Sequence, residues 1–313
     1  MKKIKNDLTL SAVSTKNKNR MSVCFPSSRF LRLFQLMLIA LVMAACSKDN
    51  DKPVANNISL HFNNTFKNSS IVLGEADSPT ATANTSANGQ VHHFSELKYV
   101  ISNIRLVKID GTEIPYHVND LDKGATVVNQ AKLSTLDYML ADVPVGEYKQ
   151  IKFGFGIKQG LNTLDQFRFP IFYGIAEAND TEMMWQWATG YRFAKIEGFY
   201  ESDQKKFTIH TGSTLNGKAG QPDTYVQGVD AYRDITLDLN TALVVGGNKP
   251  EITIKADFDK LFSGKNKITI DAKYATAPQQ HEGMEVMVEY VNNMGGDGQE
   301  DRSGMFSIQK IEN

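Results

Sequence analysis

A run of aromatic and sulfur-containing side chains is the first feature of the sequence that could do chemistry. The segment Met183–Tyr191 reads MMWQWATGY and holds both tryptophans of the chain, Trp185 and Trp187. In an extended segment alternate side chains share a face, so the two indoles would point to the same side. Paired aromatic rings beside methionine usually pack a core. On a surface the same pair would form a stacking platform.

A single histidine lies near the end of a predicted strand downstream of this run. Phe207–Thr214 reads FTIHTGST, so Thr208 and His210 share one face of a strand that ends at Gly212. A lone histidine in this position is usually a structural residue with its hydrogen bonds satisfied. Imidazole also suits copper and zinc, which makes His210 a candidate metal ligand.

The motifs of common enzymes are missing from the sequence. It contains no G-x-S-x-G, no H-E-x-x-H and no P-loop. The run Gly154-Phe155-Gly156 is too short to cradle a phosphate. The acids Asp257 and Asp259 suit a solvated strand end better than acid–base chemistry. We therefore expect a binding protein and not an enzyme.

Several motifs in one order resemble the copper-binding MbnP family. Its hallmark is a Trp-x-Trp-x-x-Gly-Tyr run preceded by methionine and followed, after a strand, by His-Leu-Gly-Ser-Thr, where this chain has HTGST. The family's YxxSNIxL strand and its FxxGVPxxLN segment also have counterparts here. The matching stretches are Lys98–Leu106, Phe153–Asn162, Met183–Tyr191, Glu197-Gly198, His210–Thr214 and Met305–Ser307, within a resemblance that spans Ile58–Ile311.

The resemblance implies a β-sandwich that binds one copper ion. In the family a di-haem cytochrome-peroxidase-like partner oxidises a tryptophan of the motif to kynurenine, which then ligates the metal. Indole offers only a donor N–H, whereas the opened ring carries an aniline nitrogen and a carbonyl that can bind metal. By this resemblance either Trp185 or Trp187 is the modified residue, and His210 is a copper ligand.

The chain departs from the family pattern directly after the Leu-Asn motif. Members with the sequence LNHxD have a histidine there, and this chain has Thr163. A threonine hydroxyl is a poor copper ligand, so the expected second histidine is missing. Substitute ligands would have to come from other donors in the chain, namely Met183, Met184, His117 and His281.

We expect β-strands to position the candidate ligands, because sequence patterns typical of strands are the most frequent ones in the chain. Leu97–Ile109 is rich in β-branched and aromatic residues and ends at Asp110-Gly111, a hairpin-type turn. The glycines inside Tyr148–Ile157 indicate a bulge or close packing. Single helical turns are expected at Asp257–Leu261 and Ser134–Ala141. Further strands are expected at Ile58–Phe62, Tyr191–Tyr200, Lys206–His210, Asp234–Leu239, Glu251–Asp257 and Met305–Ile311.

Many strands separated by turn signals predict an all-β fold, a β-sandwich of antiparallel strands with long loops. The small and polar segments Ser78–Gln90 and Met294–Ser303 are expected to be such loops. We expect one MbnP-like sandwich domain over residues 57–313.

The N-terminal segment has the parts of a lipoprotein signal peptide. An apolar run, Leu33–Val42, follows positive residues, and Ala44-Ala45 stand directly before Cys46. The run is too short for a transmembrane helix, which needs ~20 residues. We predict a signal peptide over residues 1–45, with Met21 as an alternative start, and a lipid on Cys46.

The lipid on Cys46 would anchor the protein through a flexible tether, residues 46–56. The tether begins with SKDNDKP after the cysteine, and this resembles the acidic export signal of Bacteroidota lipoproteins. That signal places a lipoprotein on the outer face of the outer membrane. A plain linker, which leaves the periplasmic face open, is the alternative interpretation.

Removal of the signal segment changes the charge of the protein. Residues 1–45 hold eight of the 34 basic and one of the 35 acidic residues, so the net charge moves from −1 to −8. An acidic surface argues against nucleic acid as a partner. No cysteine remains besides Cys46, so no disulfide and no cysteine-rich zinc site are expected.

Three hypotheses for function follow from the sequence. The first is a copper-handling lipoprotein that is the substrate of a redox partner. The second is a cell-surface β-sandwich that recognises a glycan or a protein without a metal, and the third is a scaffold whose tryptophans are core. Buried tryptophans close to His210 would favour the first hypothesis, and exposed tryptophans with no histidine nearby would favour the second.

Overall fold

The computed structural model describes residues 56–176, 182–185, 190–202, 204–278 and 284–313. The described residues belong to one compact unit, Pro53–Asn313. The remaining unit, Met1–Lys52, includes Cys46 and the predicted signal peptide and lies outside the described residues. Among the residues described, no helix has the length and apolar character that a membrane crossing requires.

One sheet of the described chain has five strands in the order β16–β14–β1–β2, with β7 also paired to β1. Its pairs are antiparallel except β1 and β14, which run parallel. A parallel pair needs a long connection, and here most of the second sheet lies between the two strands in sequence. The strands are β1 (Ile58–Phe66), β2 (Ser69–Ser70), β7 (Asp137–Leu140), β14 (Glu251–Asp257) and β16 (Phe306–Glu312).

The second sheet has nine strands in the order β13–β8–β4–β9–β10–β15, and three short strands also pair with β4. The pairs are antiparallel apart from β10 with β15. The strands on the path are β13 (Arg233–Val245), β8 (Gly146–Phe155), β4 (Val91–Lys108), β9 (Ala194–Tyr200), β10 (Lys205–Thr211) and β15 (Thr276–Ala277). The short ones are β3 (Asn84–Thr85), β5 (Glu113–Tyr116) and β6 (Thr126–Asn129).

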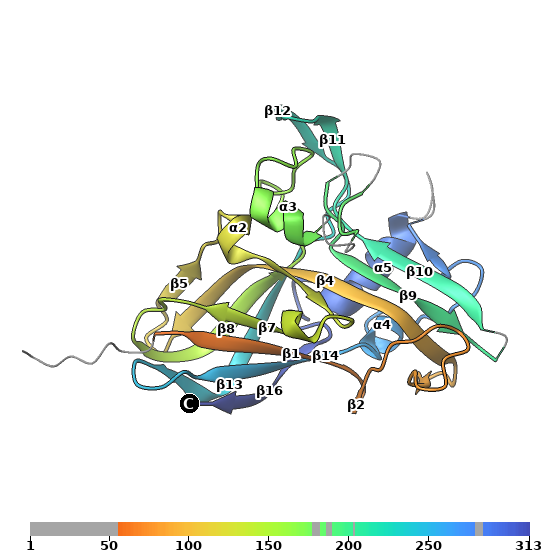
Figure 1. Ribbon diagram of the computed structural model, residues 1–313, viewed down its shortest axis with the longest axis horizontal. Coiled ribbons are helices and arrows are strands. Elements are labelled where there is room, and N and C mark those ends of the chain that lie inside the picture. The colour runs from red at the N-terminus through yellow and green to blue at the C-terminus, as the bar shows by residue number, and fades with distance from the viewer. Residues whose placement is uncertain (1–55, 177–181, 186–189, 203, 279–283) are drawn as a thin grey trace, which may run out of the picture. The chain divides into compact units, whose positions relative to one another are not determined.

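Aromatic rings from the two sheets, whose strands are labelled in Figure 1, meet in a shared core. Phe62 of β1 packs edge-on against Tyr99 of β4 and Phe153 of β8, with ring centroids 6.2 and 6.4 Å apart. Phe306 of β16 contacts the same two residues at 5.9 and 5.2 Å. These contacts confirm the predicted β-sandwich, since the inner faces of two sheets bury each other's apolar side chains.

Glycine in β8 allows the close packing that the sequence predicted. A Cβ on Gly154 would lie 2.4 Å from the ring of Tyr232. The hairpin predicted at Asp110-Gly111 also forms, because β4 and β5 pair on either side of it. A separate two-stranded hairpin follows β10 in the chain. It consists of β11 (Leu215–Lys218) and β12 (Gln221–Gln227).

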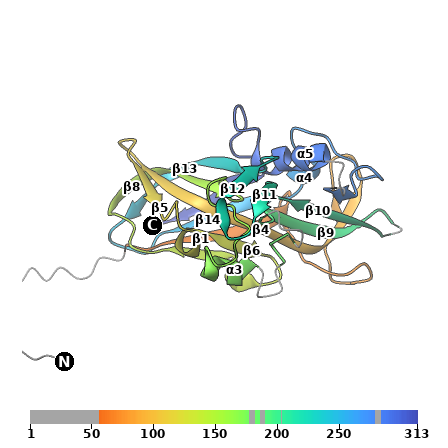
Figure 2. The same ribbon diagram turned by 90° about the horizontal axis from the view of Figure 1, so that it is seen from above.

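Helix is more abundant than the sequence analysis predicted. The longest of the described helices, α5 (Met284–Gly295), buries apolar side chains at helical spacing, which include Val286, Tyr290 and Met294. It packs against α4 (Figure 2). The side chain of Asn293 in α5 donates a 3.0 Å hydrogen bond to the carbonyl of Leu261 in α4. The other helical elements are α2 (Leu121–Gly124), the 3₁₀ turn η1 (Leu133–Thr135), α3 (Pro170–Ala176) and α4 (Lys260–Ser263).

The two predicted helical turns had different outcomes. α4 begins after Asp259, close to the turn predicted at Asp257–Leu261. The turn predicted at Ser134–Ala141 was largely wrong, because only η1 is helical and the rest is strand β7. Pairing with β1 decides this segment, since Tyr138 and Leu140 lie in register with Leu60 and Ile58.

Candidate metal centre

The two ends of the tryptophan motif form a short antiparallel pair. The N–H of Trp185 donates to the carbonyl of Gly190 at 3.0 Å, and the N–H of Arg192 donates to the carbonyl of Met183 at 2.9 Å. Met184 and Tyr191 form the bridge between these two bonds. The backbone therefore holds Trp185 next to the start of β9, which follows at Ala194. Trp187 lies outside the described residues.

Asn162 connects three of the motifs that the sequence analysis singled out. Its side-chain oxygen accepts a 3.0 Å hydrogen bond from the N–H of Tyr191, and its amide donates to the carbonyl of Ser213 at 3.3 Å. Gly190 leaves room for this amide, because a Cβ there would lie 2.5 Å from the Asn162 oxygen. The Gly190 φ of +92° also suits glycine. The Leu-Asn, Gly-Tyr and His-Thr-Gly-Ser-Thr motifs thus meet at one buried amide.

Gly212 makes room for the indole of Trp185. A Cβ at this position would lie 2.8 Å from the indole nitrogen and 2.7 Å from the carbonyl of Tyr191. The indole is 7% exposed. The guanidinium of Arg192 lies 4.9 Å from the centre of the ring and covers part of its face. The indole is therefore enclosed and has no open face for stacking on a ligand.

His210 lies beside the enclosed indole. The centroids of the two rings are 6.2 Å apart and their planes are inclined by 59°. His210 is at the end of β10, opposite Lys195 of β9, and its Nε2 lies 2.7 Å from the carboxylate of Glu197. A carboxylate accepts, so Nε2 carries the proton, and in neutral imidazole Nδ1 then has the free lone pair.

The carboxylate of Glu197 stays ionised in this arrangement. The hydrogen bond from His210 lowers its pKa, and the positive charge of Lys195 adds to this effect against the cost of partial burial. Carboxylate, imidazole and metal often form such a chain, in which the carboxylate orients the ring. Glu197 was part of the motif match, but its place beside His210 depends on the register between β9 and β10.

Lys195 lies at the centre of a group of carboxylates next to the histidine. Its ammonium is 2.8 Å from Glu96, 2.5 Å from Glu182 and 3.7 Å from Glu197. Burial disfavours the ammonium, but hydrogen bonds to Glu182 and Glu96 outweigh it and raise the pKa of Lys195. Glu197 and Glu96 also line a groove of about 680 Å³ on this face of the sheet.

Thr163, which replaces the family's histidine, is completely buried. Its hydroxyl accepts a 3.0 Å hydrogen bond from the N–H of Asp165, so it shapes the turn after Asn162. Asp165 in turn accepts from the N–H of Phe167 at 2.9 Å. The residue that would be the second imidazole is therefore a structural residue of the loop.

Of the substitute ligands proposed from the sequence, the structure describes Met183, Met184 and His117. Met183 is fully buried, and Met184 packs against the same core. His117 is exposed after β5 and stacks edge-on against Tyr116 at 4.7 Å. His281 lies outside the described residues. Within the described parts of the chain, no three His, Cys, Asp or Glu side chains gather closely enough to hold a metal ion.

The side chains that do meet are one imidazole, one carboxylate and one indole. With an unmodified tryptophan, these three side chains offer at most two metal donors, Nδ1 of His210 and an oxygen of Glu197. Oxidative opening of the Trp185 ring would add an aniline nitrogen and a carbonyl close to the imidazole. Modification of Trp185 would therefore add donors to a set that otherwise has at most two.

Comparison with known proteins gives two matches. The sequence model of the MbnP family matches residues 55–285. Among solved structures, MbnP from Methylosinus trichosporium shares 13% identity and a TM-score of 0.51, over 80% of this chain and 97% of that chain. At this identity the second match shows a shared fold. No curated protein sequence matches the chain.

Proposed function

Because the chain belongs to the MbnP family, we propose that it is a copper-binding protein whose site is made from His210 and a modified Trp185. The observation that carries this proposal is the packing of a 7% exposed indole beside a histidine, with ring centroids 6.2 Å apart. Gly212 leaves room for the indole, and Gly190 leaves room for the side-chain amide of Asn162. The resemblance inferred from the motifs thus agrees with the family match.

The proposed ligand is kynurenine in place of Trp185. An indole N–H cannot bind a metal by a lone pair, but the aniline nitrogen and carbonyl of kynurenine can. Copper accepts nitrogen and oxygen donors of this kind. His210 would complete the site through Nδ1, with Glu197 holding the ring from the other side. Trp187 is the alternative site of modification.

An oxidising partner and an exported location belong to the same proposal. A di-haem peroxidase-like protein would supply the oxidising equivalents for ring opening, and the protein itself would be its substrate and not an enzyme. The predicted lipid on Cys46 would place the domain in the cell envelope, at the outer membrane, where such a partner can reach it. The sequence of the N-terminal segment and the family match support this arrangement.

Glycan recognition by the tryptophans is less consistent with the geometry. A stacking platform needs an exposed aromatic face. Trp185 is enclosed, and Arg192 covers part of its ring at 4.9 Å. The remaining alternative is a tryptophan that only packs the core.

Copper titration tests the proposed ligand set. The protein is isolated from its native host, so that any modification is present, and compared with a His210→Ala variant expressed in the same host. We expect His210→Ala to lower copper affinity by about tenfold or more. The control is His117→Ala, which removes an exposed histidine packed on Tyr116 and should leave the affinity unchanged. Equal affinity of wild type and His210→Ala would remove His210 from the site.

A further inference from the structure

Four exposed aliphatic side chains gather at one end of the sandwich. They are Met139, Val145, Ile109 and Val244, with exposed fractions of 60, 55, 51 and 42%. We call them the apolar end patch. Large apolar side chains with this exposure mark contact surfaces when they are neighbours.

Hydrogen bonds and strand register place Ile109, Val145 and Val244 close together. The N–H of Ile109 donates to the carbonyl of Glu147 at 3.1 Å, and Val244 lies in register with Glu147 across the β13–β8 pair. The ammonium of Lys108 donates to the carbonyl of Val145 at 3.2 Å. The patch therefore covers the ends of β4, β8 and β13, which lie together in Figure 1.

The first described residues of the chain join the sandwich at the same end. The carbonyl of Asn56 accepts a 2.8 Å hydrogen bond from the N–H of Val143, two residues before Val145. The side chain of Asn57 contacts the sulfur of Met139 at 3.6 Å. The chain that leads back to Cys46 thus leaves the domain beside the patch.

The length of that chain limits the distance between the lipid and the patch. Asn56 lies ten positions after Cys46, and even a fully extended chain of this length spans at most about 35 Å. A domain on so short a connection meets the bilayer first with the end where the connection begins.

We propose that the apolar end patch rests on the phospholipid bilayer and inserts its aliphatic side chains among the headgroups. This inference relies on the proposed lipid anchor at Cys46. Aliphatic side chains gain free energy on leaving water, and a single lipid-anchored domain is oriented by such contacts. Charges of both signs flank the patch, Lys108 and Lys149 with Asp110 and Glu147. The contact should therefore be insensitive to salt.

This orientation would hold the Trp185–His210 pair away from the membrane. His210 lies in register with Lys195, and Lys195 with Lys98 of β4. Ten residues of strand lead from Lys98 to Lys108 beside the patch, which corresponds to about 30 Å. A soluble partner could then reach the site from the aqueous side.

Single-cysteine labelling of the full lipidated chain tests the contact. No cysteine other than Cys46 follows the predicted cleavage site, so Val145→Cys and Ile109→Cys each add one reactive thiol. Val226→Cys is the matched control, because Val226 is an aliphatic residue of β12 that is 65% exposed. Each variant is labelled with an environment-sensitive dye and reconstituted into phosphatidylcholine vesicles that contain brominated lipid.

We expect dyes at residues 109 and 145 to be quenched by the brominated lipid at low and high salt, and the dye at residue 226 to stay unquenched. Equal quenching at all three positions, in a chain that floats with the vesicles, would overturn the docking while the anchor stands. A chain that fails to float would overturn the anchor, and the docking with it. Circular dichroism checks that each variant is folded.

Discussion

At the scale of single residues, small side chains and buried polar groups determine the geometry of the centre. Gly190 and Gly212 are the two positions where a Cβ would collide with Asn162 or with Trp185. A substitution at either position would displace a buried group, and close-packed interiors resist such a change. The glycines of the motifs therefore serve the packing of the indole as much as the turn of the backbone.

Replacement of Gly212 by alanine should destabilise the protein and disturb the indole. The new methyl group would lie within 2.8 Å of the Trp185 nitrogen, and overpacking of this kind costs about 1–3 kcal/mol. Urea unfolding followed by tryptophan fluorescence measures the loss. The control is Gly160→Ala, where no atom lies within 4 Å. An equally small loss of unfolding free energy in both variants would contradict the close contact between Gly212 and the indole of Trp185.

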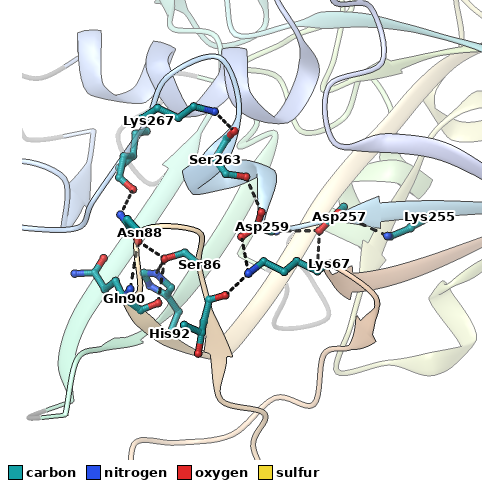
Figure 3. A network of polar contacts seen from close by, with 12 residues as sticks. Lys67, Ser86, Asn88, Gln90, His92, Lys255, Asp257, Asp259, Ser263 and Lys267 are labelled. Atoms are coloured by element: carbon teal, nitrogen blue, oxygen red, sulfur yellow. Dashed lines mark hydrogen bonds and ion pairs between the residues drawn. The ribbon is translucent and has the colours of Figure 1, made fainter.

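A second feature at this scale is His92, a fully buried histidine at the start of β4 that belongs to a polar network (Figure 3). Its ring stacks on Phe262 with centroids 4.0 Å apart, and Nε2 lies 3.3 Å from the hydroxyl of Ser86. Burial, with a smaller contribution from the charge of His93, lowers the pKa of His92 from 6.5 to about 3. The folded protein therefore keeps this imidazole neutral.

Acid should destabilise the protein through His92. Below its unfolded pKa of about 6.5 the unfolded chain binds a proton that the folded chain does not, so stability falls as the pH drops towards 3. The loss near pH 4 would be roughly 3 kcal/mol at most. In urea unfolding at pH 7 and pH 4, His92→Phe should lose less stability on acidification than wild type and His93→Gln. An unchanged loss in His92→Phe would contradict this account.

At the scale of elements, the centre depends on how three loops and two strands meet. Asn162 is the common point, because its amide bonds the backbone at Tyr191 and at Ser213. Strand register then places Glu197 of β9 beside His210 of β10. Neither relation is encoded within one motif, since each joins segments that are far apart in the chain.

Loss of the Asn162 amide should loosen all three segments together. Asn162→Ala leaves the buried N–H of Tyr191 without its acceptor, and an unsatisfied buried group costs about 1–3 kcal/mol. Hydrogen exchange should rise at residues around 190–192 and 212–214. Asn63→Ala, which removes an exposed side-chain bond to Gln309, is the control and should leave exchange at these residues unchanged. Faster exchange at only one segment would argue against a common connection.

Removal of the Glu197 carboxylate should weaken copper binding without removing a ligand that the proposal requires. Outer carboxylates of this type typically account for a 10–100-fold difference in metal affinity. We expect Glu197→Ala to fall in this range and Glu197→Gln, which keeps an acceptor, to lose less. Glu113→Gln, in a surface pair with Lys152, should match wild type. Copper titration of variants from the native host gives the comparison, and full affinity in Glu197→Ala would exclude the positioning role.

At the scale of the whole molecule, the sequence predicted the family and the sandwich. It could do so because the motifs contain residue types that the local backbone geometry requires. Glycine and alternating apolar residues indicated strands and close packing, and the aromatic core confirmed them. The parallel pairing of β1 with β14 could not be predicted from local sequence patterns, because it pairs residues as far apart in the chain as Ser59 and Glu251. α5 was missed although its apolar residues have helical spacing, and Glu197 was not recognised as a partner of His210 because that requires the register.

The most direct test of the central claim is the mass of the Trp185 peptide. The protein is isolated from its native host, or after co-expression with the proposed di-haem peroxidase-like partner, and is digested and mapped by mass spectrometry. We predict a peptide whose mass change equals conversion of tryptophan to kynurenine, with fragment ions that place the change at Trp185. Copper binding by a protein with two intact tryptophans, or a change only at Trp187, would contradict the proposed site.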